Sequence, residues 1–78
     1  MLEIRTTGGN RYIVMGQRVL KNGQRLKHKD CPIVLWVGSC AHDGSRPSGR
    51  PTLGRSLCIS FNSGLYINGT ITSITETD

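Results

Sequence analysis

Glycine-containing turns divide this chain into segments that are too short for stable helices but long enough for β-strands. The clearest turn is Asn22-Gly23, which has similar basic and apolar residues on both sides. Both central residues of a type I′ hairpin turn need positive φ, and Asn-Gly adopts that conformation readily. A short helix over residues 17–21 is the alternative, but Gly16, itself expected to form a bulge or bend, leaves it too little length. No other segment carries a helical repeat of apolar residues.

The remaining segments alternate apolar and polar residues or are rich in β-branched residues, as strands are. Strands are expected at residues 2–5 and 11–15, in the hairpin 18–27, and at 33–37, 57–61, 65–67 and 70–75. Residues 33–37 lack polar alternation, which predicts a strand covered on both faces, either centrally in a barrel or under a partner subunit. Trp36 is expected in the core. Asn68-Gly69 is expected to form either a turn or a bulge. The predicted fold class is all-β, a small barrel or strongly bent antiparallel sheet of about six or seven short strands.

The 78 residues are expected to form a single domain, residues 1–78, with a long loop at 38–56 and a frayed tail at 76–78. The core of such a small chain supplies only about 3–5 kcal/mol unless a disulfide, a metal or a partner subunit reinforces it. A homo-oligomer is therefore expected. An odd number of cysteines, three, disfavours a disulfide framework and fits a reducing compartment. With neither a secretory signal nor an apolar run of about 20 residues, the sequence predicts a cytoplasmic protein without a membrane partner.

Positive charge is concentrated in the middle of the chain. The formal net charge is +5, and all ten basic residues lie between positions 5 and 55, where Asp30 and Asp43 are the only acids. A chain of this kind attracts polyanions such as nucleic acid and nucleotides. Ordinary solubility charge is the alternative explanation.

The long loop Gly38–Ser56 contains four glycines, two prolines and three arginines, and it lies between two apolar strands. Arginine forks beside exposed backbone N–H groups suit phosphate groups. We expect a nucleotide-sized ligand here, because glycine-rich loops close over small anions; a loop that binds nothing is the alternative. The expected phosphate contacts are Arg46, Arg50 and Arg55 with the backbone of Gly44, Gly49 and Gly54, and the expected contacts to a base or sugar are His42, Tyr12 and Tyr66.

Binding of DNA or RNA is the main alternative function. In a hairpin that turns at Asn22-Gly23, odd-numbered residues after the turn share one face, so a basic stripe can follow a phosphate backbone. The residues of this alternative are Arg18, Lys21, Arg25, Lys27 and Lys29. The same charges could instead protect an edge strand from aggregation. Residues 47–51 resemble the DNA-binding AT-hook motif, but Ser48 stands where the motif has its first arginine, and few aromatic residues are present for base stacking.

Metal binding and catalysis are disfavoured. The residue types at His28, Cys31, Cys40 and His42 suit zinc, but Cys31 and Cys40 bracket an expected strand, which holds them about 20–25 Å apart. Cys40 with His42 and Asp43 could form a nucleophile with its base, but such near neighbours in an extended loop rarely reach the required geometry. No cofactor and no enzymatic activity are expected.

Both ends of the chain resemble short phage-encoded β proteins. The opening residues 4–12 combine a strand, a Thr/Gly turn and an aromatic residue, and residues 69–74 are similar to the Thr/Ser-rich final strand of that group. The resemblance implies a non-catalytic binder, such as one that sequesters a nucleotide signal of host antiviral defence in the host cytoplasm. A third candidate is a protein-interaction or virion module.

Overall fold

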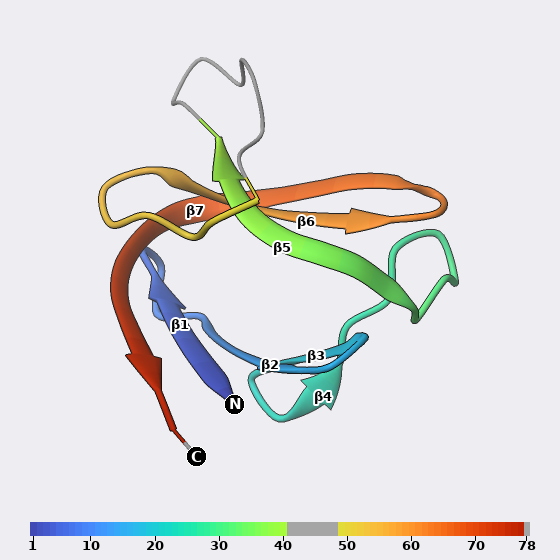
Figure 1. Ribbon diagram of the computed structural model, residues 1–78, viewed down its shortest axis with the longest axis horizontal. Helices are drawn as coiled ribbons and strands as arrows, with labels where there is room; N and C mark the ends of the chain where they lie inside the picture. The colour runs from blue at the N-terminus through green and yellow to red at the C-terminus, as the bar shows by residue number, and fades with distance from the viewer. Residues whose placement is uncertain (41–48, 78) are drawn as a thin grey trace.

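The computed structural model describes residues 1–40 and 49–77, which fold into antiparallel β-strands (Figure 1). Those residues contain no helix, so the all-β prediction is confirmed. The strands are β1 (Leu2–Thr6), β2 (Arg11–Met15), β3 (Arg18–Lys21), β4 (Gln24–Arg25), β5 (Val34–Cys40), β6 (Ser56–Phe61) and β7 (Gly64–Glu76).

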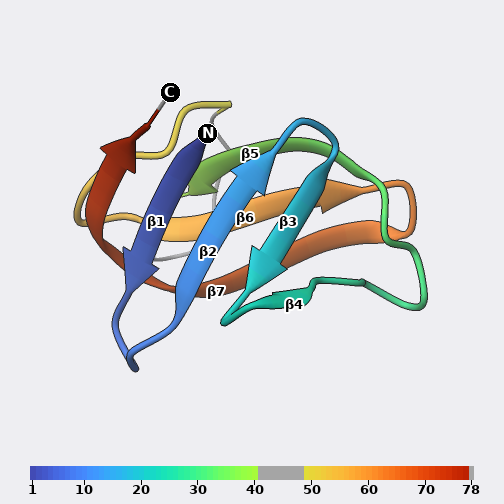
Figure 2. The same cartoon turned by 90° about the horizontal axis from the view of Figure 1, so that it is seen from below.

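The seven strands form one bent sheet in the order β4-β3-β2-β1-β7-β6-β5. The last strand in sequence, β7, lies between β1 and β6 and curves from one to the other (Figures 1 and 2). Its first half pairs with β6 and its second half with β1, so β7 belongs to both halves of the sheet. The outer strands β4 and β5 do not pair, and the sheet does not close. Of the two predicted forms, the strongly bent sheet is the one the chain adopts.

Two bulges allow β7 to bend between its partners. Opposite β6, Ser56 pairs with Thr70 and Leu57 with Asn68, which leaves Gly69 as the extra residue. Opposite β1, the register shifts again between Arg5 and Thr6. A bulge strengthens the local twist and bends the strand that carries it. The Asn68-Gly69 signal is therefore a bulge rather than a turn.

The turns follow the glycine signals. Asn22 and Gly23 have φ of 52° and 87°, as the type I′ turn between β3 and β4 requires. Gly8 and Gly9, with φ of 90° and 80°, join β1 to β2. Gly16 belongs to the tight turn between β2 and β3, and residues 18–21 form a strand, so the helical alternative is excluded.

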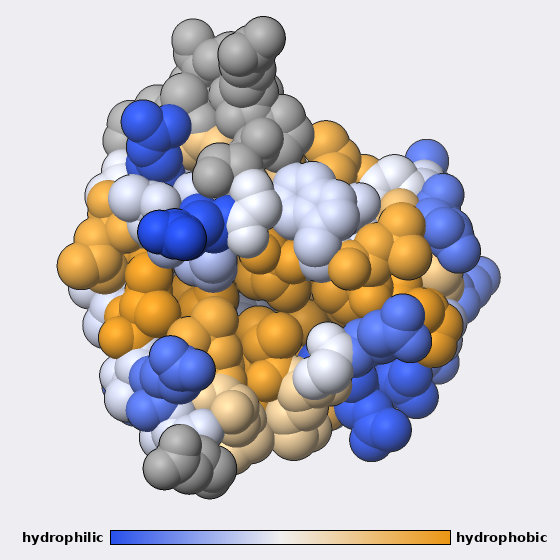
Figure 3. All heavy atoms as spheres, viewed as in Figure 1, coloured by the Kyte–Doolittle hydropathy of each residue, from blue (hydrophilic) through white to orange (hydrophobic). Residues whose placement is uncertain are grey.

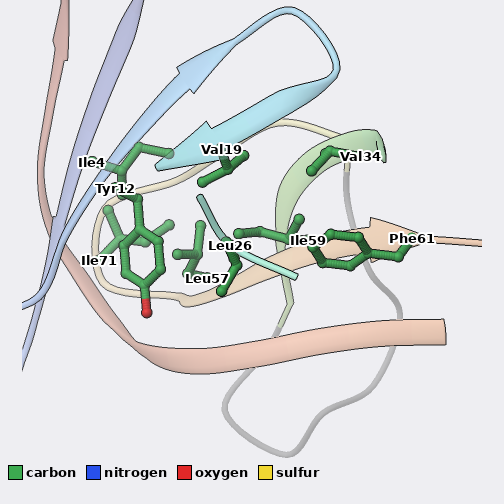
Figure 4. Close-up of a cluster of buried hydrophobic side chains, with 9 residues drawn as sticks. All are labelled: Ile4, Tyr12, Val19, Leu26, Val34, Leu57, Ile59, Phe61 and Ile71. Atoms are coloured by element: carbon green, nitrogen blue, oxygen red, sulfur yellow. The ribbon is translucent and has the colours of Figure 1, made fainter. Parts of the chain in front are cut away.

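The core fills the concave side of the sheet (Figure 4). Residues that face each other across the strands, such as Ile4 and Tyr12, point to the same side because partners in register share a face. Leu26 follows β4 and Val34 begins β5, the two outer strands, and both side chains belong to the core. The buried apolar residues of this cluster are Ile4, Tyr12, Val19, Leu26, Val34, Leu57, Ile59, Phe61 and Ile71.

The expected central position of residues 33–37 is wrong, and cover of their exposed side by a partner subunit stays a prediction. Ile33 and Leu35 expose 39% and 49% of their surface, and Trp36 is half-buried rather than part of the core. The reason is the topology, because β5 is an outer strand of the sheet. It contacts the turn between β2 and β3 through Val34 N–H, which donates to Gln17 O at 2.9 Å. Figure 3 shows apolar side chains gathered across the face over which β5 runs.

Two predicted boundaries also change. Strand β5 continues to Cys40, and Ser39 and Cys40 are fully buried, so the connection spans residues 41–55 rather than 38–56. The tail is held in place through position 77, because Glu76 ends β7 and Thr77 N–H donates to Met1 O at 2.8 Å.

Candidate polar cluster and basic edge

Four polar side chains meet at one end of the concave side, around the hydroxyl of Tyr66. Tyr12 and Lys21 are register partners on β2 and β3, so both point inward, while Tyr66 and Asn68 lie two residues apart on β7. Lys21 Nζ donates to Tyr66 Oη at 3.1 Å, and Asn68 Nδ2 donates to it at 2.9 Å. Tyr12 Oη lies 3.2 Å from the same oxygen. We call these four residues the tyrosine cluster.

The electrostatics of the two tyrosines differ. Burial raises the pKa of Tyr66, but hydrogen bonds from Tyr12, Lys21 and Asn68 and the charge of Lys21 outweigh it, so the pKa of Tyr66 is lowered. Burial raises the pKa of Tyr12, and its hydrogen bond to Tyr66 and the nearby phenol charge add to that shift. The ammonium of Lys21 lies 5.9 Å from the Tyr12 ring centroid and 5.8 Å from that of Tyr66, within range of a cation–π interaction.

A histidine packs against the cluster from the segment after β4. The ring of His28 stacks on Phe61 at a centroid distance of 5.7 Å and is T-shaped with the Tyr66 ring at a centroid distance of 6.5 Å. The His28 carbonyl accepts a hydrogen bond from Ser63 Oγ at 2.7 Å, which ties this segment to the β6–β7 turn. His28 is therefore a packing residue beside Tyr66.

A second feature is a row of cations along the β3–β4 edge of the sheet. They are exposed, and within residues 1–40 and 49–77 they make no ion pair or hydrogen bond through their side chains. We call them the basic edge: Arg18, Arg25, Lys27 and Lys29. By contrast, Glu3 approaches Arg5 at 3.1 Å and Arg11 at 3.9 Å, so part of the remaining positive charge is neutralised locally.

The predicted basic stripe is only partly correct. Strand β4 ends at Arg25, and Lys29 and Asp30, with φ of 49° and 65°, turn the chain between His28 and Cys31. Lys27 and Lys29 are thus exposed but do not continue a strand. Lys21 points the other way, into the tyrosine cluster, because it is in register with Tyr12.

The phosphate site predicted in the loop lies partly outside the described residues, which include neither His42, Gly44 nor Arg46. Gly49, Arg50 and Arg55 are exposed. The loop is anchored at Arg50, whose carbonyl accepts from Ser39 Oγ at 2.8 Å.

Two of the predicted ligand contacts are already engaged within the protein. The backbone N–H of Gly54 donates to Ile71 O at 2.9 Å, so it cannot also donate to a phosphate. Tyr12 is fully buried, with its hydroxyl pointing toward β7 (Figure 4), and so contacts Tyr66 instead of a ligand. Tyr66 keeps partial exposure.

Two of the three cysteines are neighbours in the structure, and Cys31 lies elsewhere. Cys40 and Cys58 are buried on neighbouring strands, and burial together with the nearby Cys40 thiol raises the pKa of Cys58. Cys31 is half-buried beside the core. Among the described residues no three metal-ligating side chains come together, and His42 and Asp43 lie outside that part of the chain.

Sequence reasoning missed the tyrosine cluster as a unit. It named Tyr12 and Tyr66 as ligand contacts and Lys21 as a surface cation, and it gave Asn68 only a role in a turn or bulge. The available signal was the turn at Gly16-Gln17, which sets the register between β2 and β3 and thereby makes Lys21 face the same way as Tyr12. The contact with β7 is long-range and carries no local signal.

Comparison with known proteins gives no match: no protein-family model, no curated protein and no solved structure is similar to the chain. Within residues 1–40 and 49–77 there is also no helix that could cross a membrane.

Proposed function

We propose that the protein binds a phosphate-bearing ligand without performing chemistry on it. The observation that carries the proposal is the basic edge, four exposed cations with no acidic partner in the described part of the chain. Unpaired surface cations raise the folded protein's electrostatic free energy, and an anionic partner lowers it. Arginine and lysine bind phosphate well because both stay charged and donate several hydrogen bonds.

The arrangement of the basic edge favours a strand of nucleic acid. Its cations come from β3, from β4 and from the segment that follows, so they are spread along the edge rather than gathered around one point. No enclosed pocket is found among the described residues that would surround a single nucleotide. A chain of phosphates can contact separate cations in succession.

A nucleotide-sized ligand at Arg50 and Arg55 is the second candidate. It is favoured by the anchoring of this segment, since Ser39 holds the carbonyl of Arg50, and the backbone of Arg55 accepts from Ile71 N–H at 2.8 Å. In the phage setting that the resemblance implies, such binding would sequester a nucleotide signal of host defence. The third candidate, a protein-interaction or virion module, would bind neither of these ligands.

Binding measured against salt separates these candidates. For single-stranded DNA, each phosphate contact contributes about 0.7 to the slope of log affinity against log salt. We therefore expect replacement of Arg18, Arg25, Lys27 and Lys29 by glutamine to reduce that slope by about 3. A matched control carries Arg5→Gln, which removes a cation already paired with Glu3 and should leave the slope nearly unchanged.

The contrary results are equally specific. Salt-insensitive binding of a nucleotide that is lost with Arg50→Gln and Arg55→Gln would replace the first candidate with the second. An absence of affinity for both nucleic acid and nucleotides would refute phosphate binding and leave the interaction module.

A further inference from the structure

The Tyr66 hydroxyl receives more hydrogen-bond donors than a neutral phenol can satisfy. A neutral phenol oxygen has two lone pairs and one proton to donate. Lys21 Nζ at 3.1 Å and Asn68 Nδ2 at 2.9 Å are donors that occupy both lone pairs. The proton of Tyr66 must then go to Tyr12 Oη, 3.2 Å away.

That neutral arrangement leaves the proton of Tyr12 without an acceptor. Tyr12 is fully buried, and Tyr66 Oη is its one hydrogen-bond partner among the described residues. If Tyr66 is ionised, its oxygen accepts from Lys21, Asn68 and Tyr12 together, and every donor is satisfied. A buried donor without an acceptor is unfavourable, so the geometry stabilises the ionised form of Tyr66.

The groups around Tyr66 act in the same direction. Lys21 on β3 is the nearest cation, and Tyr12 on β2 and Asn68 on β7 are uncharged donors. The ring of His28, after β4, is T-shaped with the Tyr66 ring, and no carboxylate contacts Tyr66 within the described residues. The lowered pKa of Tyr66 agrees with this set of neighbouring donors and charges. Tyr66 is partly rather than fully buried.

We propose that Tyr66 is a preorganised nucleophile that accepts an acyl group from an activated acyl donor, with Lys21 and Asn68 holding its oxygen in place. In that step the phenolate Oη of Tyr66 forms a bond to the acyl carbon, and the bond from the acyl carbon to its leaving group breaks. The leaving group departs with the electron pair, and no proton is released in this step because Tyr66 loses its proton to water on ionisation, before the attack. Lys21 uses one of its three N–H donors on Tyr66, and another is free to stabilise the oxygen of the tetrahedral intermediate.

Direct titration provides the first test. The chain has only two tyrosines, so absorbance at the phenolate band resolves both. We expect one tyrosine to ionise below the ordinary value of about 10, and that step to vanish in Tyr66→Phe. In Lys21→Met the step should move up toward the ordinary value, while Lys27→Met, which removes an exposed lysine, leaves it in place.

Acetylation provides the second test. We expect N-acetylimidazole at neutral pH to acetylate Tyr66 at least about tenfold faster than a free tyrosine derivative, because nucleophilic rate follows the phenolate fraction. Mass spectrometry locates the acetyl group, and hydroxylamine removes it from tyrosine but not from lysine. Lys21→Met should abolish the advantage and Lys27→Met should keep it.

Two results would overturn the proposal: a Tyr66 ionisation at or above the ordinary value, or acetylation no faster than that of the free tyrosine derivative. If circular dichroism shows that Lys21→Met does not fold, Asn68→Ala, which removes one donor, replaces it. An unchanged titration and rate in that variant would contradict the assignment as well.

Discussion

Gly69 shows why a single residue in the final strand resists substitution. Its φ is 58°, a conformation that residues with a side chain rarely adopt, and a Cβ there would lie 3.0 Å from the Cβ of Thr6. The glycine thus permits both the bulge in β7 and its close approach to β1. Gly16 has nearly the same φ, 59°, but open space around it.

This pair separates backbone strain from crowding. We expect Gly69→Ala to lower the free energy of unfolding by about 2–3 kcal/mol, since a strained backbone conformation alone costs about 1–3 kcal/mol. Gly16→Ala should cost about 1 kcal/mol, from the backbone term alone. Urea unfolding of both variants gives the difference. Equal losses of unfolding free energy in the two variants would mean that Thr6 moves aside without cost, so that its close contact does not add to the strain at position 69.

At the scale of elements, β7 is the strand on which the fold depends. It pairs with both β1 and β6, and its residue Ile71 lies buried where the strand passes from one partner to the other. Ile71 also exchanges backbone hydrogen bonds with Gly54 and Arg55, so the same point anchors the loop. Ile67, four residues earlier in β7, is 49% exposed.

Truncation of these two isoleucines should therefore have unequal effects. We expect Ile71→Ala to lower the free energy of unfolding by about 2–5 kcal/mol, the range for a buried isoleucine. Ile67→Ala should change it by less than about 1 kcal/mol. Chemical denaturation with both variants measures this, and similar losses at the two sites would contradict the central position assigned to Ile71.

The sequence predicted individual turns well because turn chemistry is local. Positive φ at Asn22 and Gly23 follows from those two residues alone. It did not predict the place of β7, because strand order depends on pairing between distant segments. The error over residues 33–37 has the same origin, since a purely apolar strand is usually central and here it is the outer strand β5.

The candidate site was predictable only in parts. Tyr66 and the cations of the basic edge were identified by residue type, but the inward direction of Lys21 depends on its register with Tyr12. The sequence could not exclude Gly54 as a phosphate contact. Its N–H donates a hydrogen bond to Ile71 O, seventeen positions later in the chain, and such a contact has no local signal.

At the scale of the molecule, the open sheet leaves apolar surface and two unpaired outer strands. Figure 3 shows the apolar side chains on the face that β5 crosses, and the exposed residues of this segment are Ile33 and Leu35. Outer strands of a sheet are sites at which another chain can pair. These features support the expectation of a homo-oligomer, which remains a prediction.

Sedimentation measures this directly. At micromolar concentration we expect the parent protein to have a mass above 8.5 kDa, the mass of one chain. In Leu35→Lys the measured mass should fall to that of one chain. Leu35 is half exposed, so the substitution should leave the fold intact, as circular dichroism can verify. Leu53→Lys, at a residue 60% exposed in the loop, is the control. A monomeric parent protein would contradict the expectation.

The position of β7 in the sheet also determines when this chain can fold during synthesis. Strands β1 to β4 and strands β5 and β6 can each form hairpins early, but β7, the strand that joins them, is translated after the other six. The two hairpin groups must therefore wait, with their apolar faces uncovered, until β7 has left the ribosome. Completion of the core therefore follows the synthesis of β7, and ribosome-bound chains that stop before residue 64 would be open to proteases and chaperones.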